Sequence, residues 1–219
     1  MTGFLRTFRQ SLPFLEKSVL GQHDVDFFLT TWNKDEGGNY IADDFYKPFL
    51  SYNLEKIVVK DIDVYNATKH VIKKINRSND IFDIDARAKE HGEYWANRLK
   101  DQWFLVKTAF EEIEEPKNYD LIFRTRFDLF LENIQFYKDN CLIIPRDIGG
   151  WSYTDHMAYG NVEVMNKYCH LHDHIYNLYE LHNIDITHAV NMPKFYIENY
   201  QTTVETRIDN SIKYFIKKV

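Results

Sequence analysis

The sequence predicts an α/β fold in which a mostly parallel sheet is flanked by helices within a single domain. Three observations favour this class. The chain has 219 residues, the usual size of one domain. Its 44% hydrophobic and 27% charged residues are typical of a folded globular protein. Short β-branched or aromatic stretches also alternate with stretches of helical spacing, which is the pattern of a parallel sheet.

The first half of the chain supplies two expected strands. A helix is expected from Ser11 to Gly21, with Pro13 in its first turn and the glycine at its end. Residues 24–31 (DVDFFLTT) and 57–62 (IVVKDI) have the composition of buried strands. The remaining segments are expected to be a polar loop over 33–43, short helices over 44–52 and 66–75, and an irregular stretch over 76–85.

The second half opens with the longest helical pattern, over residues 93–114, whose apolar residues recur at three- and four-residue steps. Pro116 ends it. Residues 119–131 (YDLIFRTRFDLFL) give the strongest strand signal of the chain. The rest is expected to be a short strand over 141–144, a loop over 149–160, a helix over 162–182 and a tail over 187–219 with more helix than strand.

Charge and composition exclude several classes of partner. There are 27 basic and 33 acidic residues, and no basic stripe, so a nucleic-acid polymer is not expected. No apolar run approaches the roughly 20 residues of a membrane span, and residues 1–20 lack the apolar core of a signal peptide. Cys141 and Cys169 lie far apart, as expected of two reduced thiols. These features predict a cytoplasmic protein without a membrane span.

The sharpest candidate site lies inside the stretch 119–131. Alternation along a strand would place Arg124, Arg126 and Asp128 on one face. Charged side chains on a core strand are costly unless they are paired or liganded, so an anionic ligand or a metal is one interpretation. A buried ion-pair network is the other, for example with Asp120, Asp61 or Asp63.

Other segments offer weaker candidates. Thr31 and Trp32 end the first expected strand, where they could hold a nucleobase or belong to the core. Asp155 and His156 lie in a loop with several aromatic residues and could supply a general base, although a helix-capping aspartate is the simpler interpretation. Near the amino terminus, Gly3 would let the main chain approach a ligand, and Arg6 could bind phosphate or simply be solvated.

Two further patterns suggest metal binding. The run His170, His172, Asp173 and His174 invites a metal hypothesis, but its spacing favours a solvated helix face. Asp83 and Asp85 form a D-x-D pattern, in a position where aspartate also favours helix capping.

Four motifs in a fixed order resemble the small GT-A-type glycosyltransferases of large DNA viruses and bacteria, including the type known from chlorella viruses. They span about two thirds of the chain. The motifs are G-F-L-R-T-F at 3–8, D-V-D-F-F-L-T-T-W at 24–32, Y-D-L-I-F-R-T-R-F-D at 119–128 and D-H-M-A-Y-G at 155–160.

The resemblance implies a GT-A-like, Rossmann-like sheet with a donor part over 1–130 and an acceptor part over 131–219. It implies a UDP- or GDP-linked sugar donor, a glycan or glycoprotein acceptor, and Mn²⁺ or Mg²⁺ under the diphosphate, in the cytoplasm of a bacterium or of a virus's host cell. The implied donor-binding residues are Gly3, Arg6, Thr7, Thr31, Trp32, Arg124 and Arg126. Asp128 would bind metal and Asp155 would be the base, with His156 as its substitute; Trp151, Tyr153 and Tyr159 would meet the acceptor.

The sequence departs from this family in two places. The family's first strand precedes the G-x-x-R-T element, which here begins at Gly3, so that strand is expected to be absent, minimal or upstream. Arg126-Phe127-Asp128 also stands where many relatives have D-x-D. Two alternative functions stay open: a non-catalytic nucleotide- or sugar-binding module, and a phosphohydrolase that uses the histidine run.

Overall fold

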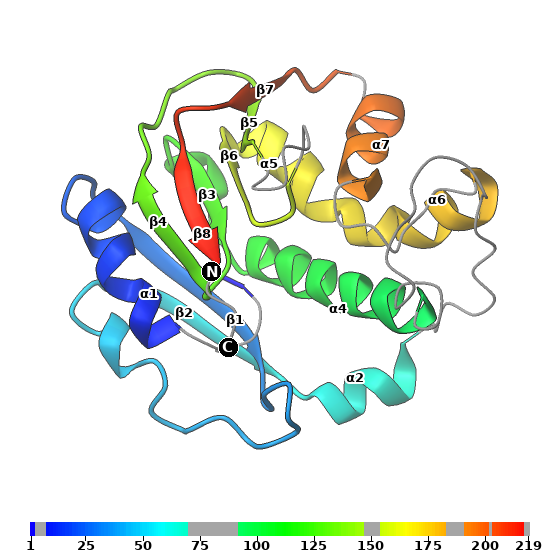
Figure 1. Cartoon of the computed structure of the whole chain (residues 1–219), viewed down its shortest axis with the longest axis horizontal. Helices are drawn as coiled ribbons and strands as arrows, with labels where there is room; N and C mark the ends of the chain where they lie inside the picture. The colour runs from blue at the N-terminus through cyan, green and yellow to red at the C-terminus, as the bar shows by residue number, and fades with distance from the viewer. Residues whose placement is uncertain (3–7, 70–91, 147–153, 183–190, 202, 217–219) are drawn as a thin grey trace.

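Three small sheets, packed with helices, organise the chain in the computed structural model (Figure 1). The structure describes residues 1–2, 8–69, 92–146, 154–182, 191–201 and 203–216. One sheet pairs β1 (Asp26–Trp32) with β2 (Asn53–Lys60), and another pairs β4 (Leu129–Asn133) with β8 (Lys213–Ile216). The four-stranded sheet has the order β3 (Ile122–Thr125), β6 (Met157–Gly160), β5 (Leu142–Pro145) and β7 (Thr206–Asp209).

The strands pair in both directions. β1 runs parallel to β2, and β5 runs parallel to β7. β6 is antiparallel to both of its neighbours, and β4 is antiparallel to β8. The predicted mixture of strands and helices in one domain is confirmed, but the sheets are short and mixed rather than one mostly parallel sheet.

Residues Met1 and Thr2 lie between β1 and the end of β3. Thr2 forms parallel bridges with Thr30 of β1 and with Arg126, the residue after β3. The Thr30 amide donates to the Met1 carbonyl at 3.0 Å, and the Thr2 amide donates to the Thr125 carbonyl at 3.1 Å. This short segment therefore links the β1–β2 pair to the four-stranded sheet.

The stretch 119–131, predicted as one strand, is two strands separated by a turn at Arg126 to Asp128. The Phe127 side chain is fully buried. Its ring centroid lies 6.4 Å from that of Phe8 and 6.5 Å from that of Phe49. The Ser11 hydroxyl donates to the Phe127 carbonyl at 2.5 Å. Because this carbonyl is satisfied by a side chain, the main chain can leave the ladder here without burying an unpaired group.

The amino-terminal helix differs from its predicted limits. α1 spans Phe8–Leu15 and continues as a π-helix, Glu16–Leu20, which Gly21 ends as expected. Ser11, where the helix was expected to begin, lies inside it. Its bond to Phe127 and the bond from the Ser18 hydroxyl to the Leu131 carbonyl, 2.6 Å, fasten this helix to the β3–β4 region.

The other helices follow the predicted ones with shifted limits. The predicted helix over 44–52 contains only a 3₁₀ turn, Lys47–Phe49, consistent with Pro48. The predicted helix over 162–182 is interrupted by a 3₁₀ turn at His170–His174. The described residues form the further helices α2 (Ile62–Thr68), α4 (Gly92–Glu111), α5 (Val162–Cys169), α6 (Ile175–His182) and α7 (Asn191–Tyr200).

Three strands that the sequence did not predict are β6, β7 and β8. All four residues of β6 are buried, so the segment shows no alternation of polar and apolar residues. Its last residue, Gly160, is enclosed so closely that a Cβ there would lie 2.4 Å from Cγ2 of Val164. The described part of the tail combines α7 (Asn191–Tyr200) with the short strands β7 and β8, in agreement with the expected mixture of more helix than strand.

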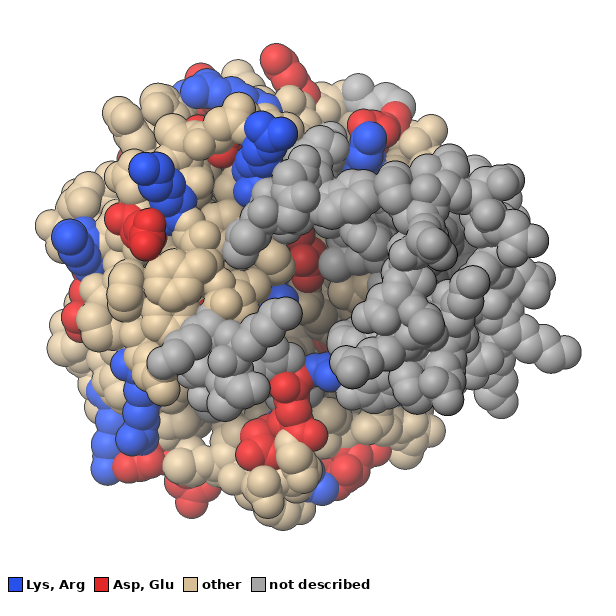
Figure 2. Space-filling view, in the orientation of Figure 1, with Lys and Arg blue, Asp and Glu red and all other residues tan. Residues whose placement is uncertain are grey.

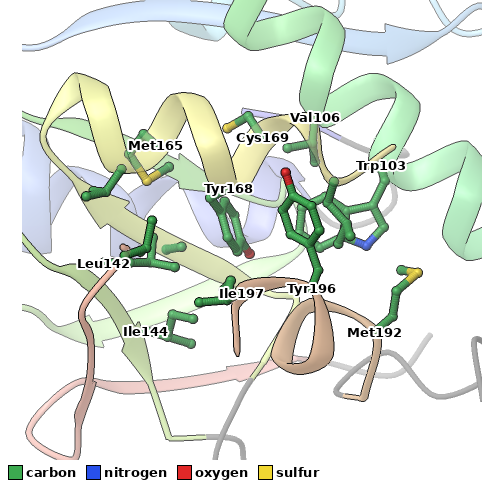
Figure 3. Close-up of a cluster of buried hydrophobic side chains, with 14 of the residues drawn as sticks. Trp103, Val106, Leu142, Ile144, Met165, Tyr168, Cys169, Met192, Tyr196 and Ile197 are labelled. Atoms are coloured by element: carbon green, nitrogen blue, oxygen red, sulfur yellow. The ribbon is translucent and has the colours of Figure 1, made fainter. Parts of the chain in front are cut away.

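Two apolar clusters form the core. Figure 3 shows the first, in which Trp103 of α4, Tyr168 of α5 and Tyr196 of α7 pack together. The second cluster joins α1 to β1, β4 and β5, and includes Phe27, Leu131 and Ile143. Each cluster contains one free, buried cysteine: Cys169 in the first and Cys141 in the second.

The outer surface in Figure 2 intersperses Lys and Arg with Asp and Glu. That is the distribution expected for 27 basic and 33 acidic residues without a charged stripe. Among the described residues, no helix combines the length and the hydropathy needed to cross a bilayer.

Candidate functional site

A buried cluster of charged side chains lies just past the carboxyl end of β3. Nε of Arg126 donates to Oδ1 of Asp128 at 2.8 Å, and Nη2 donates to Oδ2 at 2.7 Å. Nη1 of the same guanidinium lies 3.9 Å from Oδ2 of Asp155. The side chains of both aspartates are no more than 5% exposed. One arginine therefore faces two buried carboxylates.

Arg124 approaches the same cluster from β3. Its Nη1 donates to the main-chain carbonyl of Asp155, and its guanidinium lies 5.7 Å from the ring centre of Trp103. Nε and Nη2 are buried and make no hydrogen bond to the residues that the structure describes. Arg124, Arg126 and Asp128 do come together, as alternation suggested, but across a turn rather than along one strand.

The Asp155 carboxylate is held in its charged form. Burial alone acts to raise its pKa, but His156, Arg126 and Arg124 together outweigh burial and the pKa is lowered from 3.8. A hydrogen bond from Nε2 of Gln102 to Oδ2, 2.7 Å long, acts in the same direction. Asp155 is therefore ionised at neutral pH.

His156 occupies the more exposed side of the cluster, with 17% of its side chain accessible. Its Nε2 lies 3.5 Å from Oδ1 of Asp155, and its Nδ1 lies 3.1 Å from the hydroxyl of Tyr214. Its main-chain amide donates to the Thr154 hydroxyl at 3.1 Å. An imidazole between a carboxylate and a phenol has both ring nitrogens engaged and can take part in proton transfer.

Sequence reasoning missed Gln102, Thr154 and Tyr214 as members of this cluster. Gln102 is a polar residue beside Trp103 in an otherwise ordinary helix, and Tyr214 lies in a strand that was not predicted. The ion pairs of the cluster join its own members, whereas the three aspartates named as examples of partners lie elsewhere. Asp61 caps α2, Asp63 pairs with Lys34, and Asp120 pairs with Lys138.

Three other predicted site residues are core residues. Thr31 and Trp32 at the end of β1 are each 1% exposed. The Trp32 ring lies 4.9 Å from Tyr65 and 5.8 Å from Phe104. Tyr159 is fully buried and donates its hydroxyl to the Gln135 carbonyl at 3.1 Å. The structure does not bring Tyr159 to the charged cluster. Gly3, Arg6, Thr7, Trp151, Tyr153, Asp83 and Asp85 lie outside the described residues.

The histidine run is divided between different environments. His172 is near Asp173, 3.5 Å between Nδ1 and Oδ1, while Asp173 pairs with Lys107 at 2.7 Å. The ring of His174 packs against Tyr196, with 5.1 Å between ring centres. Within the described ranges, no group of three or more His, Cys, Asp or Glu side chains could hold a metal. The alternative that uses this run for phosphohydrolysis has no support from these side-chain positions.

The charged cluster does not have the donor set of a Mn²⁺ or Mg²⁺ site. Both oxygens of Asp128 accept hydrogen bonds from Arg126, and Asp155 also faces that arginine. These dications require several oxygen ligands, and adjacent guanidinium groups oppose their binding. The described residues therefore do not fit the metal that the resemblance implied.

A comparison with known protein families finds no family model that matches the chain. No curated protein matches it significantly either.

Proposed function

We propose that the protein is a glycosyltransferase that moves a sugar from a nucleotide-diphosphate donor to a hydroxyl of a glycan or glycoprotein acceptor. The observation that carries this proposal is the convergence of Arg124, Arg126, Asp128 and Asp155 past the end of β3. The cytoplasmic location expected from the sequence belongs to the same proposal.

The position of the cluster supports a ligand site. In α/β sheets, ligands bind outside the carboxyl ends of parallel strands. Thr2 bridges in parallel to Thr30 of β1 and to Arg126, so the carboxyl ends of β1, the Met1–Thr2 segment and β3 share one edge. Thr31, Trp32, Arg126 and Asp128 lie along this edge.

The strand directions also favour a GT-A-like arrangement. β3 and β5 are both antiparallel to β6 and so run in the same direction as each other. The parallel bridges of Thr2 show that β1 and β3 run in the same direction. Strand β2 is parallel to β1, and β7 is parallel to β5. Five strands therefore point one way (β1, β2, β3, β5 and β7), and β6 points the other way. We infer that the β1–β2 pair and the four-stranded sheet are parts of one interrupted GT-A-like sheet.

In glycosyl transfer, the two arginines and the Asp155–His156 pair would have different roles. When the bond between the anomeric carbon and the diphosphate oxygen breaks, negative charge grows on the leaving group, and Arg124 and Arg126 can stabilise it. A bond forms from the acceptor oxygen to the anomeric carbon, and the acceptor's proton must leave. We assign that proton to the Asp155–His156 pair. No step is assigned to a metal, because the described residues do not fit one.

The test is release of nucleoside diphosphate from a panel of UDP- and GDP-sugars, with acceptor glycans and with EDTA or Mn²⁺. Asp155→Asn should lower turnover at least about a hundredfold while donor binding by calorimetry persists. Asp139→Asn is the matched control, since Asp139 pairs with Arg207 at an exposed position. Equal turnover in Asp155→Asn and Asp139→Asn would contradict the catalytic assignment.

A second candidate is a binding module without turnover, and the lowered pKa of Asp155 favours it, because lowering the pKa of a carboxyl group makes its carboxylate a weaker base. In that case nucleotide sugars should raise the melting temperature and Arg126→Met should abolish the rise, while no diphosphate is released.

A further inference from the structure

The carboxylate of Asp155 is held as an anion and is therefore a poor acceptor for a proton. Gln102 donates to its Oδ2 at 2.7 Å, and Arg124 donates to its main-chain carbonyl, so the residue is fixed in place. Burial acts to raise its pKa, but the nearby histidine and arginines outweigh burial, and the pKa is lowered from 3.8. Asp155 is thus better suited to stabilise a neighbouring cation than to take up a proton itself.

The neighbouring imidazole of His156 offers one nitrogen for that proton. Its Nε2 lies 3.5 Å from Oδ1 of Asp155, which favours the neutral tautomer with the hydrogen on Nε2 and the lone pair on Nδ1. Nδ1 lies 3.1 Å from the hydroxyl of Tyr214. The basic lone pair of the imidazole is therefore directed at the phenol, and a proton from a ligand would reach it through Tyr214.

The register of β8 fixes Tyr214 beside this nitrogen. Along β8, Tyr214 is half-buried and the next residue, Phe215, is exposed. Tyr214 pairs with Leu131 of β4, and Phe215 pairs with Phe130, whose ring it stacks on with 4.8 Å between centroids. A slip of one residue would turn Tyr214 to the opposite face of the sheet, so this stacked pair helps to keep the phenol at the charged cluster.

The surroundings of the phenol oxygen favour the loss of its proton. The hydroxyl of Thr154 lies 3.4 Å away and is a second hydrogen-bond partner. Burial acts to lower the pKa of Arg126, but nearby anionic groups, which include an ionised Tyr214, outweigh burial and raise it. The guanidinium and the ionised phenol therefore stabilise each other. A protonated His156 would donate from Nδ1 to the same oxygen.

We propose that Asp155, His156 and Tyr214 form a proton relay in which Tyr214 is a catalytic residue that takes the proton of the acceptor hydroxyl; this assignment rests on the proposed function. The acceptor's proton passes to the phenol oxygen as the phenol's own proton passes to Nδ1 of His156. The acceptor oxygen bonds to the anomeric carbon, and the bond from that carbon to the diphosphate oxygen breaks, its electron pair leaving with the diphosphate. Asp155 stays ionised and stabilises the imidazolium, as the aspartate of a Ser-His-Asp triad does. The imidazolium then returns its proton to solvent.

The relay makes the phenol nucleophilic, and this can be measured without a sugar donor. An aryl sulfonyl fluoride forms a bond from its sulfur to the phenol oxygen and releases fluoride, while His156 takes the phenol's proton. Peptide mapping by mass spectrometry should show Tyr214 reacting at least about tenfold faster than Tyr137. Tyr137 is the matched control, because it is also half-buried and its hydroxyl lies 3.3 Å from the side-chain oxygen of Gln135 instead of an imidazole. In His156→Gln, which cannot take up a proton, the two tyrosines should react at similar rates.

Transfer to an acceptor tests the catalytic role. Tyr214→Phe keeps the ring and removes the hydroxyl, so the turnover of a nucleotide sugar with its acceptor should fall at least about a hundredfold. The affinity for the donor, measured by calorimetry, should not change, because the phenol acts on the acceptor. Tyr137→Phe should keep its turnover within about twofold of the unaltered protein, since it removes a single hydrogen bond outside the cluster.

The outcomes separate the relay from the proposed function. Full turnover of Tyr214→Phe in an active protein would overturn the relay and leave the glycosyltransferase assignment intact. Absence of transfer by the unaltered protein with every donor and acceptor would overturn the proposed function, and the labelling rates would then decide on the relay. Equal labelling of Tyr214 and Tyr137 in the unaltered chain would overturn the relay in either case. The labelling rates also decide if Tyr214→Phe fails to fold.

Discussion

The guanidinium of Arg126 binds the carboxylate of Asp128 through two parallel hydrogen bonds, 2.8 and 2.7 Å long, although only one residue separates them in the sequence. Neighbours at this spacing on a regular strand point to the same face. Here the main chain also turns between them, at Phe127. The pair therefore both ends β3 and positions a cation beside Asp155.

The first prediction concerns the geometry of Arg126. Arg126→Lys keeps the charge but loses the planar, two-pronged contact with Asp128. We expect donor turnover to fall about a hundredfold, as when one preorganised donor to developing charge is removed. Steady-state release of nucleoside diphosphate measures it.

Arg207→Lys serves as the matched control, because Arg207 makes an exposed pair with Asp139. Its turnover should stay within about twofold of the unaltered protein. A comparable loss in both variants would contradict a specific role for the Arg126 guanidinium.

The second prediction concerns stability. Asp128→Asn leaves the guanidinium of Arg126, only 17% exposed, without its closest counter-charge. The free energy of unfolding should fall by about 3 kcal/mol, the lower end of the cost of breaking a buried pair. Urea denaturation monitored by tryptophan fluorescence provides the measurement.

Replacing both Arg126 and Asp128 tests whether the loss of stability comes from an unpaired charge or from altered packing. The double variant Arg126→Met with Asp128→Leu should recover part of the lost stability, because neither member of the pair is left as an unpaired charge, while Asp155 loses its contact with Arg126. It should stay inactive in transfer. Failure to recover stability would show that the cost of Asp128→Asn has another origin.

The third prediction concerns Gly160. An added Cβ would lie 2.4 Å from Cγ2 of Val164 and 3.0 Å from the Cys141 carbonyl oxygen. Gly160→Ala should therefore destabilise the fold by about 1–3 kcal/mol, the usual cost of overpacking.

A double-mutant cycle with Val164→Ala tests the cause. The coupling free energy between the two substitutions should be favourable and at least about 0.5 kcal/mol, since the shorter side chain relieves the closer contact. Strict additivity would mean that the Cys141 carbonyl, rather than Val164, limits the space.

The fourth prediction concerns pH. Burial lowers the pKa of His172 below 6.5, and the nearby carboxylate of Asp173 opposes this only in part. Between the lowered folded-state pKa and about 6.5, the unfolded chain binds more protons, so stability should fall as the pH drops through this range. Above it, His172 is neutral in both states and has no such effect.

Melting temperatures at pH 7.5 and 5.5 measure this dependence. His172→Phe, which keeps a ring against Phe104, should show a smaller drop in melting temperature than the unaltered chain. His23→Phe changes an exposed histidine and should leave the drop unchanged. The same drop in all three proteins would contradict the assignment to His172.

The fold could be predicted from sequence where one local signal dominated. The helix pattern over 93–114 corresponds to α4, and the runs near 24–31 and 57–62 correspond to β1 and β2. Strand β6 could not be predicted because it is fully buried and shows no alternation of polar and apolar residues. The short strands β7 and β8 pair with β5 and β4, which are distant in sequence, so no local pattern predicts them. The turn at Phe127 depends on Ser11, more than a hundred residues away, and no local pattern reveals such a contact.

The candidate site was predictable to a similar degree. Arg124, Arg126, Asp128 and Asp155 could be singled out because charged residues are unusual among apolar ones. Gln102 and Tyr214 could not, because they reach Asp155 and His156 only through tertiary contacts. Tyr159 differs from its expected surroundings: the resemblance implied an acceptor contact for it, and its ring lies in the core.

The two buried cysteines, Cys141 and Cys169, allow local unfolding to be followed through their reaction with a thiol reagent. Burial raises the pKa of the Cys169 thiol to about 12 and also raises that of Cys141, so neither should react with a thiol reagent while its surroundings stay folded. Each reports on a different apolar cluster. Comparing the alkylation rates of the two thiols in mild denaturant would therefore reveal whether the two apolar clusters unfold together or one after the other, without introducing any label.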